Sequence, residues 1–249
     1  MDTSVQQFAV AHLLRRPEVV ETGGFVAGFD PDSASPYINY ATPLPGAEPT
    51  AADVAALVGE FRARGLRPRL EYAPVAAPAV EPALRAAGFT TEEEHVYLVC
   101  TPRTLTPPAA GGPTAAVPRD DAEYTGLDAA LCEAFDGEFV PSPEGGARLR
   151  RTQEGGGGAR LVRAEDGTIA GGGSCSPPAV GTSELAGVGT RPAHRGRGVA
   201  SAVVASLTEA MFAAGAGSVW LEYSGEGSRR VYERLGYRAA GDRLYISLP

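Results

Sequence analysis

The sequence predicts a mixed α/β fold, because short apolar stretches typical of strands alternate with segments of helical periodicity. An apolar run at 185–188 leads into a loop rich in glycine and arginine. Apolar residues then recur at three- and four-residue spacing from Ala200 to Ala214, which indicates a helix. Residues 219–223 are predicted to form another strand. Residues 228–235 are predicted to form another helix, which ends at Gly236 because glycine suits the position just after a helix.

The second half of the chain shows the same alternation from its start. A strand is expected from Ala115, followed by a helix that Asp120 or Asp121 caps and that runs to about Phe135. Residues 136–158 are expected to be irregular, because they end in a run of glycines. The remaining strands are predicted at 159–164, 168–176 and 183–190, with a hairpin turn at Asp166–Gly167 and a last strand or pair at 238–248.

Length and composition predict two domains. A chain of 249 residues is long for one minimal domain and comfortable for two small ones. The segment 106–113 is rich in proline and glycine, which hold regular structure poorly, so it is the best linker candidate. The predicted domain limits are therefore 1–108 and 114–249.

The first half of the chain echoes its end. The triplet Leu-Glu-Tyr at 70–72 recurs at 221–223. Gly88 falls against Gly236, and Tyr97 against Tyr245 at the same offset. A helix-like run at 52–64 precedes the first copy, as the helix after the glycine- and arginine-rich loop precedes the second. We therefore expect the N-terminal domain to be a degenerate copy of the C-terminal one.

Composition excludes several classes of function. The net charge of −8 argues against general binding of nucleic acid, which needs a basic surface. The cysteines Cys100, Cys132 and Cys175 are too widely spaced for a zinc site or a disulfide framework, so no metal is expected and a reducing compartment is favoured. We expect a cytoplasmic protein with no membrane association, because neither a signal segment nor a spanning run is present. All basic residues other than histidine are arginine, and the bias towards Ala, Gly, Arg and Pro is typical of a GC-rich bacterial genome.

The loop at 190–200 is the strongest functional signal. Glycines at 196 and 198 let backbone amides approach a ligand, and the following helix contributes unpaired amides and a positive dipole end. Arg195 and Arg197 add positive charge, so the loop suits a pyrophosphate. A nucleotide P-loop is excluded because no Gly-Lys-Ser/Thr follows, and a dinucleotide fingerprint because G-x-G-x-x-G is absent.

The remaining pattern, R-x-x-G-x-A at Arg195, Gly198 and Ala200, resembles the acetyl-CoA loop of the GNAT superfamily of N-acetyltransferases. The segment V-Y-E-R-L-G-Y at 231–237 is similar to a second motif of that family, in the right order along the chain. The resemblance covers roughly residues 114–249. It implies a mostly antiparallel central sheet flanked by helices, in a tandem arrangement. The N-terminal copy is expected to be inactive, because prolines and Glu48 stand at 43–49 in place of the loop.

The same resemblance implies roles for individual residues. The strand before the loop, which Gly187 and Gly189 would allow to bulge, is expected to bind the pantetheine arm through its backbone. Tyr232 is the expected general acid, and Glu184 the expected base, with Glu222 as the fallback carboxylate. The expected coenzyme-binding residues are Val188, Gly189, Thr190, Arg195, Gly196, Arg197, Gly198, Val199 and Ala200.

One position departs from the family's pattern. The family often has an asparagine where this chain has Gly225, so the contacts usually made there are in doubt. The segment 136–154 is expected to line the acceptor pocket. It carries both signs of charge, so its charge does not name the acceptor.

Together these observations predict an N-acetyltransferase that moves an acetyl group from acetyl-CoA directly to a primary amine. The acceptor is expected to be a small molecule or a peptide, and the protein a monomer or homodimer. Two alternatives stay open. One is a non-catalytic acyl-CoA-binding or regulatory protein. The other is an enzyme with a longer acyl donor, for which the glycines at 171–173 would leave room.

Overall fold

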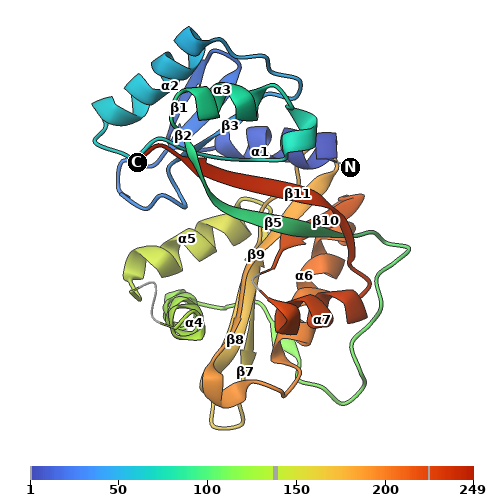
Figure 1. The fold of residues 1–249 in the computed structure, drawn as a ribbon. Coiled ribbons are helices and arrows are strands. Elements are labelled where there is room, and N and C mark those ends of the chain that lie inside the picture. The colour runs from blue at the N-terminus through green and yellow to red at the C-terminus, as the bar shows by residue number, and fades with distance from the viewer. Residues whose placement is uncertain (1, 137–139, 224) are drawn as a thin grey trace. The chain divides into compact units, whose positions relative to one another are not determined.

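The computed structural model describes residues 2–136, 140–223 and 225–249 (Figure 1). Contacts group the chain into two compact units, one of Met1–Tyr97 with Ala240–Pro249 and the other of Leu98–Ala239. The domain limits at 1–108 and 114–249 stay a prediction. Within the described ranges, no helix is both long and apolar enough to cross a membrane.

The first unit is built on a sheet that the end of the chain completes. Strands β1, β2 and β3 are antiparallel neighbours, and β3 pairs in parallel with β4. Strand β11 then pairs antiparallel with β4, from Leu244↔Tyr72 to Ser247↔Arg69, and separates it from β5. The strands of this sheet, in spatial order, are β1 (Glu18–Thr22), β2 (Phe25–Phe29), β3 (Tyr40–Pro43), β4 (Arg69–Tyr72), β11 (Arg238–Ser247) and β5 (Thr90–Cys100).

The helices of the first unit cover this sheet and supply much of its core. The unit contains α1 (Asp2–Leu13), α2 (Ala51–Ala63), the short 3-10 helix η1 (Pro74–Ala76) and α3 (Val80–Ala86). Helix α2 buries its apolar face, and its Phe61 packs edge-on against Phe29 of β2 with ring centroids 5.0 Å apart. The two copies of the sequence echo share the order helix, strand, helix, strand. The first copy has α2, β4, α3 and β5, with η1 between β4 and α3. The second has α6 (Val199–Ala213), β10 (Ser218–Glu222), α7 (Glu226–Arg234) and β11.

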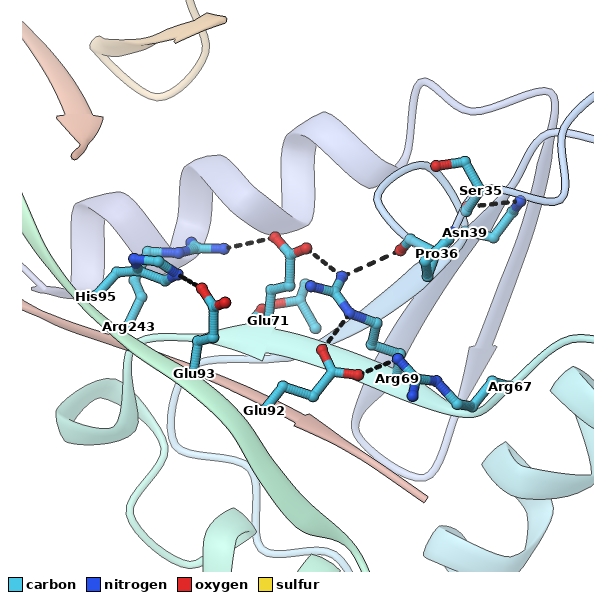
Figure 2. Close-up of polar contacts among 11 residues, drawn as sticks. Ser35, Pro36, Asn39, Arg67, Arg69, Glu71, Glu92, Glu93, His95 and Arg243 are labelled. Atoms are coloured by element: carbon cyan, nitrogen blue, oxygen red, sulfur yellow. Dashed lines mark hydrogen bonds and ion pairs between the residues drawn. The ribbon is translucent and has the colours of Figure 1, made fainter. Parts of the chain in front are cut away.

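A buried ion cluster ties the strands of the first unit together (Figure 2). Arg69 of β4 is 1% exposed, and its Nε lies 2.7 Å from a carboxylate oxygen of Glu92 on β5. The same guanidinium contacts Glu71, whose other carboxylate oxygen lies 3.4 Å from Arg243 of β11. Because a buried charge that loses its partner is strongly destabilising, this cluster favours one register of β4, β5 and β11.

The second unit contains the strands that were predicted before and after the loop. Strands β10 and β9 pair in parallel, and the remaining neighbours are antiparallel. The predicted hairpin joins β7 and β8, where Gly167 adopts a φ of +84°. In spatial order the strands are β10 (Ser218–Glu222), β9 (Thr182–Thr190), β8 (Ile169–Cys175), β7 (Gly158–Arg163) and β6 (Ala115–Ala116).

One expectation about the second unit is wrong, because 136–158 is not irregular throughout. Helix α5 (Pro143–Glu154) occupies much of the segment, and the Ser142 side chain caps it by accepting a hydrogen bond from Gly145 N at 3.0 Å. A Cβ on Gly146 would lie 2.9 Å from the Thr125 backbone nitrogen, so the glycines serve close packing of α5 on α4. The remaining expectation, an acceptor pocket lined by 136–154, falls partly on residues 137–139, which lie outside the described ranges.

The helices of the second unit otherwise follow the predicted pattern. They are α4 (Asp121–Ala134), α5 (Pro143–Glu154), the 3-10 helix η2 (Pro192–His194), α6 (Val199–Ala213) and α7 (Glu226–Arg234).

Candidate functional site

Strand β9 contains a bulge and extends beyond its parallel neighbour, β10. Its register against β8 shifts between Gly172↔Gly189 and Ser174↔Ala186, so β9 carries one extra residue, and Gly187 there has a φ of +61°. Pairing with β10 ends at Trp220↔Glu184. Residues 185–190 therefore extend past the last paired residue of β10, where their main-chain groups can meet a ligand. The bulge expected from the glycines is confirmed.

The loop after β9 leads into α6, and no side chain caps the start of this helix. Gly196 and Gly198 have φ values of +77° and +81°, a region that side chains with a Cβ rarely adopt. Gly198 is the N-cap of α6, and the first intrahelical bond runs from Ala202 N to Gly198 O at 3.0 Å. The amides of residues 199–201 thus have no partner within the helix and are available to an anion.

The corresponding helix of the first unit is closed at the same end. Thr50 caps α2 by accepting a hydrogen bond from Asp53 N, and the Asp53 side chain accepts one from Thr50 N at 2.8 Å. The Thr50 hydroxyl, 2.6 Å from the Asp53 carboxylate, and the Thr50 backbone N–H both donate to it and hold the pKa of Asp53 below its usual value, so a carboxylate occupies this helix start. A carboxylate at this position disfavours a phosphate, which agrees with the expectation that the N-terminal copy is inactive.

A cavity of about 1060 Å³ lies beside the open end of α6. Its size suits a small-molecule site, for which the usual range is about 300–1,000 Å³. Four segments line it, namely residues 107–113, the loop, the first turn of α6 and one face of α7. The lining residues that are described include no carboxylate and three basic residues, His194, Arg195 and Arg234. The cavity therefore suits an anionic ligand.

The structure brings most, but not all, of the expected coenzyme-binding residues to this cavity. The expected residues that line it are Thr190, Arg195, Gly196, Gly198, Val199 and Ala200. Val188, Gly189 and Arg197 belong to the same strand and loop but do not line it. The contacts of all nine with a coenzyme stay a prediction.

The arginines of the loop have different tasks. The Arg195 guanidinium donates hydrogen bonds to the backbone oxygens of Ala134, at 3.1 Å, and Thr190, at 3.4 Å, so it fixes the loop against α4 and β9. Arg191 forms an ion pair with Glu133 at 2.8 Å. Arg197 is exposed and has no ion pair or hydrogen bond among the described residues. Its charge therefore has no partner among the described residues, although it lies outside the lining of the cavity.

The two expected catalytic residues are near cavity-lining residues along the chain, but neither of them lines the cavity. Tyr232 lies on α7 next to the lining residue Val231 and is 7% exposed, and burial raises its pKa to about 12. Its ring meets that of Tyr237 edge-on, with centroids 6.1 Å apart. Glu184 is half-buried on β9, opposite Trp220. Their catalytic roles stay predictions.

The departure from the family's pattern has a local cause. Gly225, which stands where an asparagine is often found, is the N-cap of α7 and has a φ of +153°. A residue with a Cβ rarely adopts that backbone conformation.

The space expected at the glycines of β8 is filled. A Cβ on Gly171 would lie 2.9 Å from Thr190 Cα, and one on Gly173 would lie 3.1 Å from a Val188 methyl group. A Cβ on Gly172 would overlap Leu127 of α4. These glycines therefore allow β8 to pack closely against its neighbours, and they leave no room there for a longer acyl chain.

Sequence reasoning missed part of the cavity wall. Residues 107–113 were predicted only as a linker, and Ser228 and Arg234 of α7 were not singled out as ligand contacts, yet all of them line the cavity. The prolines of the linker predicted restricted backbone angles, but no local pattern indicated that the segment borders a cavity.

Comparisons with known proteins agree with this geometry. Residues 129–237 match the model of the Acetyltransferase (GNAT) family. The chain is similar to the structure of a GCN5-related N-acetyltransferase from Kribbella flavida, with 26% identity over 100% of this chain and 96% of that one and a TM-score of 0.82. A tandem GNAT protein from the clavulanic acid biosynthesis pathway shares the fold at 12% identity, covering 98% of this chain and 94% of its own, with a TM-score of 0.61. No curated protein sequence matches the chain.

These findings confirm the predicted fold class, a mixed α/β fold whose central sheet is mostly antiparallel and flanked by helices, as in tandem structures of this kind. They also confirm the family resemblance that the loop indicated.

Proposed function

We propose that this chain, whose residues 129–237 form an acetyltransferase domain of the GNAT family, transfers an acetyl group from acetyl-CoA to a primary amine. The observation that carries the proposal is the open start of α6. Its amides and the left-handed Gly196 and Gly198 border a large cavity whose described lining has no carboxylate. The diphosphate of coenzyme A matches that site in charge and in its need for backbone donors.

The pantetheine arm runs along β9 beyond its pairing with β10. Residues 188–190 offer main-chain groups there, and a backbone N–H left unpaired by the bulge is the donor proposed for the thioester oxygen. Holding the thioester and the amine together supplies much of the rate enhancement, because the reaction then becomes effectively unimolecular.

The chemistry needs only two proton transfers. The neutral amine attacks the thioester carbon, and Glu184 accepts the amine proton directly or through a water molecule. The carbon–sulfur bond then breaks, and Tyr232 donates its hydroxyl proton to the leaving thiolate. Burial raises the pKa of Tyr232 to about 12, so this group carries its hydroxyl proton at neutral pH.

A second candidate function is non-catalytic binding of acyl-CoA. It is favoured by the one observation that neither Tyr232 nor Glu184 lines the cavity. The acceptor, a small molecule or peptide with a primary amine, is part of the first proposal only.

The two candidates are separated by titrating the protein with coenzyme A in a calorimeter and by following thiol release from acetyl-CoA with a panel of amines. The enzyme is expected to bind coenzyme A and to release thiol only with an acceptor, and Glu184→Gln should slow turnover by about 10²–10⁴-fold without a matching loss of binding. Binding without turnover on any amine supports the second candidate. No binding at all refutes both.

A further inference from the structure

The segment that leads into the second half of the chain is fixed to α7 and approaches α6. Thr106 N donates a hydrogen bond to Leu235 O at 3.0 Å, at the end of α7. A Cβ on Gly236 would overlap the Thr104 carbonyl group, so the two backbones are in direct contact. At the other end, the Pro113 ring lies 3.3 Å from where a Cβ on Gly198 would be. The segment therefore runs from the end of α7 to the start of α6.

Residues 107–113 all line the cavity, and all of them except Pro113 are exposed. Their composition restricts the backbone, because Pro107, Pro108 and Pro113 fix φ near −65°. Gly111 adds a left-handed turn at a φ of +79°. A segment of this kind forms a semi-rigid wall rather than a flexible connection.

We propose that residues 107–113 form the outer wall of the coenzyme site and hold the nucleotide end of coenzyme A against α6 and α7. This inference rests on the function proposed above. The nucleotide end is favoured because the cavity includes the diphosphate loop and Thr190, but not Val188 or Gly189 farther back on β9, where the pantetheine arm is expected.

The chemistry of the wall fits that end of the ligand. Proline, alanine and glycine present an apolar surface without competing carboxylates, which suits the face of an adenine ring. Across the cavity, Arg234 of α7 is exposed and has no ion pair among the described residues, so its charge is open to a phosphate.

The test compares two donors in a variant with a loosened wall. In the double variant Pro107→Gly/Pro108→Gly, binding must order a more flexible segment, so the Kd for coenzyme A should rise roughly 4- to 30-fold. The Kd for S-acetylpantetheine, which lacks the nucleotide, should rise by less than about twofold. Pro102→Gly is the matched control, because Pro102 is exposed in the same connection but does not line the cavity.

Hydrogen exchange on the unmodified protein gives a second readout that does not depend on the variant's folding. Coenzyme A should protect the amides of residues 109–112, and S-acetylpantetheine should not. The inference is overturned if the Kd of the variant for coenzyme A stays within about twofold of the unmodified protein's, or if coenzyme A and S-acetylpantetheine lose affinity equally. It is also overturned if bound coenzyme A leaves these amides unprotected. Failure of the unmodified protein to bind coenzyme A would instead refute the proposed function itself.

Discussion

Replacing Gly236 by alanine should destabilise the second unit much more than the same change at Gly215. Both glycines follow a helix, with φ values of +94° and +92°. In each case the next amide bonds back to the helix, Tyr237 N to Tyr232 O at 3.1 Å and Ala216 N to Met211 O at 3.0 Å. The two sites differ in surroundings. A Cβ on Gly215 meets nothing within 4 Å, whereas one on Gly236 would overlap the Thr104 carbonyl group.

The magnitudes follow from these geometries. A left-handed backbone costs an alanine about 1–2 kcal/mol, and the reduced freedom of its unfolded chain offsets about 0.4–1 kcal/mol. Gly215→Ala should therefore cost about 1 kcal/mol. Gly236→Ala adds an overpacking cost of about 1–3 kcal/mol, for a total of about 2–4 kcal/mol.

Urea unfolding monitored by Trp220 fluorescence measures the difference, because this single tryptophan is buried in β10 of the second unit. The two variants should show midpoints that differ while their slopes stay equal. Equal midpoint shifts for Gly236→Ala and Gly215→Ala would refute the reasoning, since they would mean that the Thr104 segment does not rest on Gly236. Gly236→Ala should also weaken coenzyme A binding, because it displaces the Thr104 backbone and with it residues 107–113 of the proposed wall.

Three further predictions concern charge and proton transfer. Tyr232→Phe should lower kcat by about 10²–10⁴-fold, and an unchanged kcat would exclude Tyr232 as the acid. Because the pKa of Tyr232 is raised to about 12, deprotonation of this group should not lower the kcat of the unmodified enzyme at any pH below 10. Burial, and to a smaller extent the charges of nearby arginines, lowers the pKa of His12 from 6.5 to about 4. The unfolded chain therefore binds this proton more tightly than the folded chain does. As the pH falls from 6.5 to 4, the free energy of unfolding should decrease by up to about 3 kcal/mol. Acid titrations of stability should show a smaller loss in His12→Phe, and an identical loss would contradict this assignment. Arg234→Gln should raise the Kd for coenzyme A several-fold at low salt and less at high salt. The control is Arg230→Gln, at an exposed position of the same helix that does not line the cavity, and it should leave the Kd unchanged. Equal effects of the two variants would mean that only the net charge of the protein affects binding.

Local sequence patterns predicted the site better than the packing around it. The strand β9, its bulge, the loop and α6 were all predictable, because the apolar periodicity and the glycines that need positive φ values act over a few residues. Helix α5 was missed because the glycine run at 155–158 predicted an irregular segment, although Gly145 and Gly146 lie within the helix. Their small size serves contact with α4, and a tertiary requirement of that kind leaves no local signal.

Long-range partners lay beyond sequence reasoning for the same reason. The pairing of Leu244 with Tyr72 joins residues far apart in the chain, and no local pattern names the partner. The direction of the linker was equally hidden. Its prolines predicted restricted backbone angles, but only the contact with Gly198 shows that it borders the cavity.

Strand β11 also determines the order in which the protein can mature during synthesis. Residues Ala240–Pro249 belong to the unit that begins the chain, so a ribosome has to translate residues 98–239 before that first unit can be finished. Until then the nascent chain exposes the edges of β4 and β5, which are open to pairing with other chains. A premature stop just before β11 would therefore damage the part of the protein that was made first.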